Sequence, residues 1–252
     1  MISDLVRIHH AEYEDDIPFW IRHTEGLDPI LEIGPGHGRV TLPLLEAGRF
    51  VVGVDRDNDS LAYLEGVLDE FNDQIRQRIS LIKSDIFDFK PEIQFGVVII
   101  PCNTYSSFNS EDRPRLLKRV FSSLKEGGLL IVSLPNPERM EEIYAELHGT
   151  DQVESPDLEA VITHPETGFP IQVSSRVRAS SISLLWDWIY DHMHPNGQVE
   201  REVVTVEHFP ASREAILTEL REGGFSDVLC LGDYSGEPYS TSSPYLILIC
   251  HK

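Results

Sequence analysis

The sequence is poor in basic residues. It contains 21 lysines and arginines against 42 aspartates and glutamates, which gives a formal net charge of -21 at pH 7. A protein that binds DNA or RNA by neutralising phosphates needs the opposite balance. The composition therefore argues against nucleic acid as a partner, with a local basic patch left open.

Cysteines and long apolar runs are also scarce. The three cysteines, Cys102, Cys230 and Cys250, lie far apart and form no C-x-x-C pair. This spacing argues against a disulfide framework and a zinc ribbon, and we expect no metal site. No apolar run is long enough to span a bilayer, and the opening residues, MISDLVRIHHAEYEDD, do not resemble a signal peptide. We expect a soluble, cytoplasmic protein with no membrane partner.

The first 135 residues alternate between strand and helix patterns. Short apolar runs predict strands at 29–34, 50–55, 79–85, 95–101 and 128–135. The segments between them have apolar residues at helical spacing, and we expect the last of these helices to end at Gly127-Gly128. Strict alternation predicts right-handed crossovers and a Rossmann-like α/β fold with a parallel, doubly wound sheet. Ligands bind such sheets at the carboxyl ends of the strands.

The pattern changes after about residue 155. Residues 170–179 alternate between apolar and polar side chains, and Asn196-Gly197 lies between two strand-like runs, as in a hairpin. A helix is predicted at 213–222, followed by two more strands. We therefore predict a core made of residues 1–150 and 211–252. Residues 151–210 form an inserted antiparallel β cap that serves as a lid or as the surface of a homodimer.

Aromatic and histidine side chains stand out within this insertion. Trp186, Trp188 and Tyr190 share one face of a predicted strand, which is more typical of packing or of a dimer surface than of a substrate site, although stacking on a planar acceptor stays open. His192 and His194 also share a face, as metal ligands do. Because no cysteine or third histidine lies nearby, we expect both histidines to be solvated.

A glycine-rich loop follows the first predicted strand in EIGPGHG. Gly34 permits a sharp turn, and Gly36 and Gly38 leave the backbone bare where a ligand approaches closely. Dinucleotide-binding loops have the spacing G-x-G-x-x-G, whereas the spacing here is G-x-G-x-G, and Glu32 precedes the first glycine by two positions. A tight turn without a ligand is the simplest alternative.

Two aspartates end the next two predicted strands. Asp55 ends VVGVD, where a carboxylate accepts hydrogen bonds from ribose hydroxyls in both NAD and S-adenosylmethionine (SAM) enzymes. Asp85 ends the third predicted strand in SLIKSDIFDF, at a position where a dinucleotide enzyme has no need of a carboxylate. Either aspartate alone is also compatible with a helix N-cap.

These motifs together resemble those of the class I SAM-dependent methyltransferases. The resemblance implies SAM as cofactor, Asp85 beside the adenine amino group, and a set of cofactor-binding residues at Glu32, Gly34, Gly36, Gly38, Asp55, Arg56, Asp85, Ile86 and Pro101. The stretch FGVVIIPCNTYSSF is similar to the strand and turn that face the methyl acceptor in small-molecule methyltransferases.

The C-terminal stretch LGDYSGEPYSTSSPYLILI is similar to the ending of a subgroup that includes bacterial sugar N,N-dimethyltransferases and peptide N-terminal methyltransferases. By this resemblance Asn103, Tyr105 and Ser106 orient the acceptor, and Tyr234 closes the pocket. Sugar dimethyltransferases of this kind usually carry a histidine in the turn, where this chain has Ser107.

Methyl transfer from a sulfonium is an in-line displacement that depends mainly on holding the reactants in line with water excluded. We therefore expect methylation of a nitrogen, or of an oxygen, on a small polar metabolite. The alternatives are a peptide N-terminal methyltransferase, a SAM-binding protein without catalysis, and an NAD-linked oxidoreductase.

Overall fold

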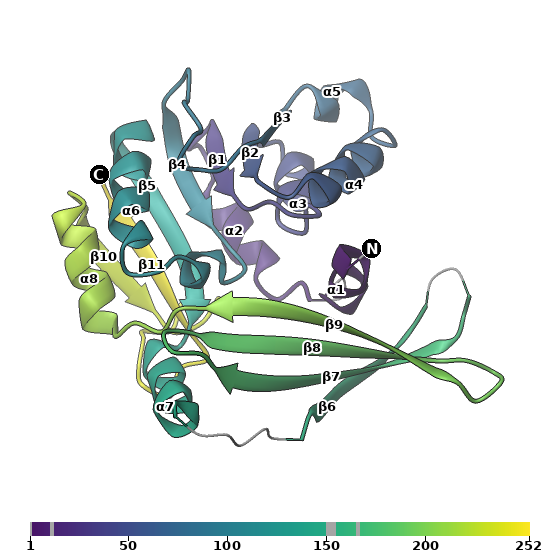
Figure 1. Ribbon diagram of the computed structural model, residues 1–252. Coiled ribbons are helices and arrows are strands. Elements are labelled where there is room, and N and C mark those ends of the chain that lie inside the picture. Colours follow the sequence, from purple (N-terminus) through teal and green to yellow (C-terminus); the bar gives the residue numbers. More distant parts are fainter. Residues whose placement is uncertain (1, 11–12, 150–154, 165–166) are drawn as a thin grey trace. The chain divides into compact units, whose positions relative to one another are not determined.

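The chain divides into two units, one of which is built on a seven-stranded mixed sheet (Figure 1). The computed structural model describes residues 2–10, 13–149, 155–164 and 167–252. The larger unit comprises Glu14–Met140 and Ala211–Lys252, and the smaller comprises Met1–Tyr13 and Glu141–Pro210. The division at Met140 falls inside helix α7 (Pro137–Leu147).

The order of strands in the large sheet is β10-β11-β5-β4-β1-β2-β3. The five strands predicted from the first half are parallel to one another, and β11 runs antiparallel to both β5 and β10. The Rossmann-like α/β sheet is thus confirmed, with an antiparallel edge. The strands are β1 (Ile30–Ile33), β2 (Val51–Asp55), β3 (Ile79–Lys83), β4 (Phe95–Ile100), β5 (Leu124–Pro135), β10 (Ser226–Leu231) and β11 (Tyr245–His251).

Helices cover both faces of this sheet because the central strands are apolar on both sides. In β4, Val98 and Ile100 face a core shared with α6 (Asp112–Ser123) and α8 (Arg213–Glu222). The alternate residues Val97 and Ile99 face a second core, shared with α2 (Ile17–His23), α3 (Thr41–Glu46) and α4 (Asn58–Leu68). A short helix, α5 (Asp73–Arg76), precedes β3.

The predicted end of the helix at Gly127-Gly128 is wrong. Helix α6 ends at Ser123, and β5 begins at the next residue because Leu124 already pairs with Phe95 of β4. The pairing then shifts register before it resumes at Leu129, and Gly127 has φ +72° within this irregular stretch. A helix cap and a strand bulge both favour glycine, so the sequence pattern fits either.

The smaller unit is a four-stranded antiparallel sheet with the order β6-β7-β8-β9. Its strands are β6 (Asp157–Thr163), β7 (Pro170–Ala179), β8 (Leu184–Met193) and β9 (Val199–His208). The predicted hairpin is present between β8 and β9, and Gly197 there has φ +83°. Helix α1 (Ile2–His10) packs Leu5 against Ile171, Val173 and Tyr190 of this sheet.

This packing explains why the first residues group with the small sheet rather than with residues 14–140. Tyr190 is fully buried beneath α1, and the His9 ring contacts Trp188 with centroids 4.9 Å apart. Tyr190 therefore belongs to the core of this unit and Trp188 packs against it, whereas Trp186 is half-buried outside that cluster. Residues 141–147, which complete α7, also group with the small sheet.

Candidate functional site

The glycine-rich loop turns sharply after β1. Gly34, Gly36 and Gly38 all have positive φ, at +76°, +53° and +88°. A β-carbon on Gly38 would lie 2.4 Å from Leu64 of α4, so this glycine allows close packing of the loop on the helix. A β-carbon on Gly36 would meet no atom within 4 Å in the described part of the chain, so the loop is bare on its outer side.

Asp55 connects this loop to the end of β2. Its Oδ2 accepts a hydrogen bond from the Gly36 N–H at 3.0 Å, and its Oδ1 accepts one from the Asp57 N–H at 2.9 Å. The N-cap of α4 is Asp57, so the alternative assignment of Asp55 as that cap is wrong. The carboxylate is held in one orientation and retains lone pairs, which suits it to bind a ligand diol. Arg56, the next residue, is exposed.

Glu32 lies below the loop and is almost fully enclosed, with 1% of its surface exposed. Its Oε2 accepts a hydrogen bond from the Thr41 hydroxyl at 2.6 Å. Burial raises the pKa of Glu32 to about 7, and the charge of Asp55 acts in the same direction, whereas Thr41 and Arg39 act against it. This carboxyl group therefore changes its charge near neutral pH, directly beneath the loop.

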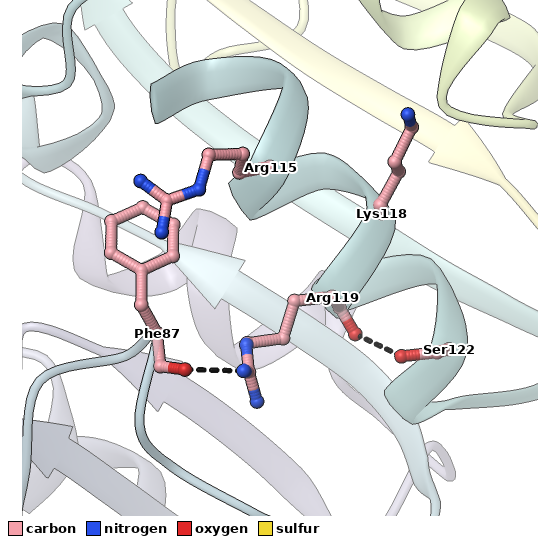
Figure 2. Close-up of a pocket in the computed structure, with 5 residues that line it drawn as sticks. All are labelled: Phe87, Arg115, Lys118, Arg119 and Ser122. Carbon is pink, nitrogen blue, oxygen red and sulfur yellow. Dashed lines mark hydrogen bonds between the residues drawn. The ribbon is translucent and has the colours of Figure 1, made fainter. Parts of the chain in front are cut away.

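The turn after β3 contains Asp85 and Ile86. Asp85 Oδ1 accepts from the backbone N–H of Phe87 at 2.8 Å, and Ile86 is buried in the core. Figure 2 shows a hollow where this turn meets α6, with Arg115 over the Phe87 ring and Arg119 directed at the Phe87 carbonyl. The Arg119 guanidinium donates to the carbonyls of both Phe87 and Phe89. Arg115 and Arg119 thus fasten the turn to α6.

The turn after β4 holds the predicted acceptor-facing residues. It begins at buried Pro101 and continues into the 3-10 helix η1 (Thr104–Ser107). Cys102 and Asn103 are consecutive non-glycine residues with φ +56° and +61°. The Ser106 hydroxyl donates to the Asn103 carbonyl at 2.6 Å. Such left-handed residues cost free energy and persist only where the surroundings fix them.

The loop and this turn are neighbours. A β-carbon on Gly34 would lie 3.0 Å from the Thr104 side chain, so the absence of a side chain at Gly34 allows the approach. The structure thus brings the glycine-rich loop and the predicted acceptor turn together at the carboxyl ends of β1 and β4.

An ion pair between Arg39 and Asp16 borders both elements. The Arg39 guanidinium donates two hydrogen bonds to the fully buried Asp16 carboxylate, at 2.6 and 2.7 Å, and a third to Cys102 Sγ at 2.9 Å. Trp20 Nε1 also donates to Asp16, at 2.9 Å. The Arg39 side chain, which directly follows the glycine-rich loop, therefore links that loop to Asp16 before α2 and to Cys102 in the turn after β4.

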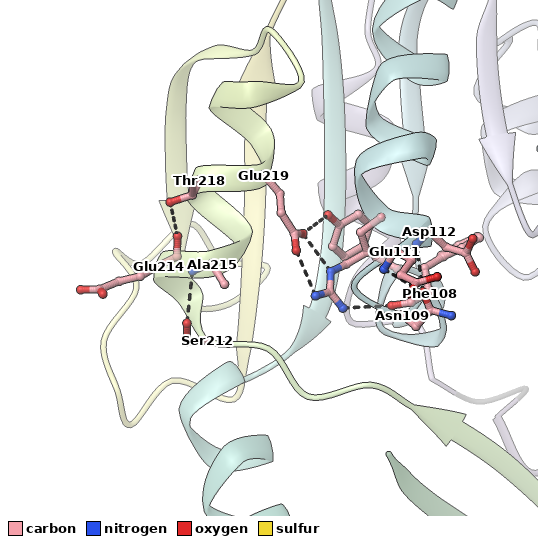
Figure 3. A network of polar contacts seen from close by, with 11 residues as sticks. Phe108, Asn109, Glu111, Asp112, Ser212, Glu214, Ala215, Thr218 and Glu219 are labelled. Carbon is pink, nitrogen blue, oxygen red and sulfur yellow. Dashed lines mark hydrogen bonds and ion pairs between the residues drawn. The ribbon is translucent and has the colours of Figure 1, made fainter. Parts of the chain in front are cut away.

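Tyr105 is held on the face of the large sheet that α6 and α8 cover, opposite to the face covered by α2. Its side chain is 1% exposed, and its hydroxyl lies 3.5 Å from Glu219 Oε2 on α8. Glu219 also accepts two hydrogen bonds from Arg113 of α6, at 2.8 and 3.0 Å (Figure 3). Burial raises the pKa of Tyr105, and Glu219 adds to that effect, so the phenol stays protonated. This location suits Tyr105 to fix the turn, whereas Asn103 is the more accessible of the two.

Tyr234 lies in the loop between β10 and β11. Its ring centroid is 5.6 Å from that of Phe19 and 6.4 Å from that of Trp20, both on α2. Burial raises the pKa of its hydroxyl, and Asp16 and Cys102 are near enough to raise it further. Tyr234 therefore lies on the side of the site where Arg39 and Asp16 meet, and the predicted role in closing the pocket stays a prediction.

The two histidines of the small sheet lie at the end of β8. His192 is in β8, and His194 lies beyond the strand end with its Nε2 3.6 Å from Glu200. Among the described residues, no group of three or more histidine, cysteine or acidic side chains is arranged to hold a metal ion. The described helices also include none long and apolar enough to cross a membrane.

Sequence reasoning missed Asp16, Arg39, Arg113 and Glu219. A signal was present for the last two, because each places a charge on the apolar face of its helix. Arg113 has helical spacing with the buried Leu116, Leu117 and Val120, and Glu219 lies beside the buried Ile216 and Leu220. A charge on a buried helix face indicates that the side chain has a partner, without identifying that partner.

Comparison with known proteins agrees with this geometry. Residues 30–128 match the family model of the methyltransferase domain. A SAM-dependent methyltransferase structure from Clostridium acetobutylicum superimposes with a TM-score of 0.72 at 15% identity, covering 97% of this chain and 94% of that one. The sugar N-methyltransferase KedS8 from Streptoalloteichus sp gives a TM-score of 0.71 at 17% identity, covering 99% and 92%.

Two relatives match in sequence, one over most of the chain at low identity and one over a short segment at higher identity. The cypemycin N-terminal methyltransferase from Streptomyces sp is 22% identical over 92% of this chain and 87% of its own length. The ribosomal RNA small subunit methyltransferase A from Nitrobacter winogradskyi is 37% identical over 27% of this chain. The match covers only 22% of that RNA methyltransferase.

Residues 30–128 match a methyltransferase domain, and the chain has the fold of the class I SAM-dependent methyltransferases. The class predicted from the loop and strand-end motifs is confirmed, and with it SAM as the cofactor of the class. The geometry fits that cofactor, because the loop is open above Gly36 and the fixed Asp55 carboxylate lies at its edge.

Proposed function

We propose that this protein transfers a methyl group from SAM to a nitrogen atom of a small polar metabolite. The observation that carries the proposal is the close approach of the Thr104 side chain, in the turn after β4, to Gly34 of the glycine-rich loop. Since the turn adjoins the loop, an acceptor bound at Asn103 lies within reach of a cofactor held by Asp55 and Gly36.

The bound cofactor supplies a methyl group already activated by the sulfonium charge. The protein has to hold the acceptor in line and exclude water, and an amine acceptor has to be neutral when it attacks. Asn103 offers neutral polar groups at the turn, and Tyr105 keeps its proton because burial raises its pKa. Positioning by neutral groups is sufficient for such a transfer, and no strong base is required.

The names of the relatives support nitrogen as the methylated atom. They include a sugar N-methyltransferase, a glycopeptide N-methyltransferase and an N-terminal methyltransferase. These acceptors differ in size, whereas the type of atom methylated is shared. The acidic composition of this chain also favours an amine over an anionic acceptor.

A second candidate is methylation of a peptide N-terminus, favoured by the relative that aligns over 92% of the chain. The test incubates the protein with SAM labelled on its methyl group and an extract of its source, and separates the products by molecular size. Label on small molecules supports the proposal, and label on polypeptide supports the second candidate. Bound SAM with no transfer to either fraction indicates a cofactor-binding protein without catalysis.

A further inference from the structure

Helix α6 contacts the turns that carry both halves of the proposed site. Arg113 near its start meets the turn after β4, and Arg119, nearly two turns later, meets the turn after β3. We propose that these are positioning residues with separate tasks: Arg113, through Glu219, sets the acceptor turn, and Arg119 sets the adenine-side turn. The inference rests on the proposed function for its assignment of the two turns.

The first task rests on a buried pair. The side chains of Arg113 and Glu219 are 4% and 14% exposed, and two hydrogen bonds join the guanidinium to the carboxylate. Arg113 Nη1 also donates to the Phe108 carbonyl at 3.0 Å, and the Tyr105 hydroxyl reaches Glu219 at 3.5 Å. Figure 3 shows Glu219 directed from α8 towards the segment that carries Phe108 and Asn109. The pair therefore contacts the acceptor turn both at Tyr105 and where the turn ends.

The acceptor turn needs such support because of its backbone. Cys102 and Asn103 both have left-handed φ values, and neither is a glycine. The Arg39–Cys102 contact fixes the first of these residues, and the Ser106 hydroxyl holds the Asn103 carbonyl. The Arg113–Glu219 pair provides the support at the far end, so its loss lets the turn relax towards ordinary backbone angles and moves Asn103.

The second task rests on backbone carbonyls. The Arg119 guanidinium donates to the carbonyls of Phe87 and Phe89, which bracket the segment directly after Asp85 and Ile86. Figure 2 shows the bond to Phe87. Asp85 in turn accepts from the Phe87 N–H at 2.8 Å. Arg119 thus holds the carbonyl of the same residue, Phe87, whose N–H orients Asp85, while Arg115 packs its guanidinium 4.4 Å above the Phe87 ring.

The two tasks predict effects on different kinetic parameters: cofactor affinity for Arg119 and kcat for Glu219. Arg119→Gln removes one of the two donors that bridge the carbonyls and loosens the adenine side. We expect the Kd for S-adenosylhomocysteine and the KM for SAM to rise at least fivefold, with kcat at saturating SAM within twofold of wild type. Glu219→Gln removes the charge that holds Arg113. We expect kcat to fall at least fivefold, with the Kd for S-adenosylhomocysteine within twofold.

Each variant has a matched control on its own helix. Lys118→Gln removes a positive charge from an exposed position of α6, and Glu222→Gln removes a negative charge from an exposed position of α8. Both controls are expected to match wild type. The assay uses the fraction that accepts labelled methyl from wild type, and amide hydrogen exchange over residues 102–108 provides a second readout. Exchange there should increase in Glu219→Gln and not in Arg119→Gln.

The inference is overturned if both variants shift the same kinetic parameter in proportion to lost thermal stability, or if neither differs from its control. Unchanged exchange over residues 102–108 in Glu219→Gln also contradicts the first task. A wild-type protein that binds SAM and methylates nothing disproves the proposed function instead. The Kd measurements with S-adenosylhomocysteine still test the task of Arg119 in that case.

Discussion

Asp55 is bonded through both carboxylate oxygens to backbone N–H groups, at Gly36 and Asp57. A hydrogen bond to a charged group contributes about 1.5–3 kcal/mol, which corresponds to about a tenfold to hundredfold change in affinity. We predict that Asp55→Ala weakens S-adenosylhomocysteine binding by at least about tenfold on this basis. Titration calorimetry measures the effect.

The control for this prediction is Asp59→Ala, which removes an exposed carboxylate from the first turn of α4. It should bind S-adenosylhomocysteine as wild type does. An Asp55→Ala protein that folds and binds as tightly as wild type contradicts the ribose-binding role of this residue.

Glu32 makes stability depend on pH. Burial raises its pKa from 4.5 to about 7, so the folded state binds the proton more tightly than the unfolded state. The free energy of unfolding therefore falls as pH rises from about 4.5 to about 7, by about 3 kcal/mol at most. Glu32→Gln lacks this dependence, so we predict that its stability relative to wild type increases over that range.

Denaturant unfolding at pH 5 and pH 8 measures the change. Glu46→Gln is the control, because Glu46 is exposed on α3 and its substitution should give the same difference at both pH values. If the stability difference between Glu32→Gln and wild type is the same at both pH values, the raised pKa is wrong.

At the scale of elements, we expect two glycines of the glycine-rich loop to have different roles: Gly38 in packing on α4 and Gly36 in cofactor binding. A β-carbon at Gly38 collides with Leu64 at 2.4 Å, whereas one at Gly36 enters open space. We predict that Gly38→Ala lowers thermal stability more than Gly36→Ala does. Left-handed backbone costs each variant roughly 1–2 kcal/mol, so the extra loss at Gly38 reports the collision.

Cofactor affinity provides a second measurement on the Gly36→Ala variant. Gly36→Ala is expected to remain folded and lose S-adenosylhomocysteine affinity, because its methyl group lies where the loop is bare. If Gly36→Ala binds normally, the cofactor does not approach this side of the loop.

Element by element, the sequence predicts the buried part of the fold best. The central strands are continuous apolar runs, and the glycines and aspartates at their ends are adjacent in sequence to those runs. Strand β6 was not predicted, because its residues are mostly exposed and apolar side chains such as Leu158 and Val161 give no regular alternation. The start of β5 was missed because Gly127-Gly128 resembles a helix end.

The network around the site could not be predicted in the same way. The Arg113–Glu219 pair joins residues 106 positions apart, and Arg39 meets Cys102 across 63 positions. Each side chain carries only a weak local signal, a charge on an apolar helix face or an arginine after a glycine. The identity of the partner depends on the sheet order, which sets α6 beside α8.

At the scale of the whole molecule, the net charge of -21 opposes binding to RNA. The ribosomal RNA methyltransferase of Nitrobacter winogradskyi matches over 68 residues only. We predict that ribosomal RNA incubated with this protein and labelled SAM acquires no label at physiological salt. An authentic ribosomal RNA methyltransferase serves as the positive control, and label in the RNA would falsify the small-molecule assignment.

The most direct test of the account is the identity of the bond formed in the product. The protein is incubated with SAM carrying a carbon-13 methyl group and the acceptor fraction, and the purified product is examined by carbon-13 NMR and mass spectrometry. We predict one labelled methyl resonance in the N-methyl region, on a product heavier than its acceptor by one or two methyl groups. A labelled O-methyl, C-methyl or S-methyl resonance, or label confined to unreacted SAM, would contradict it.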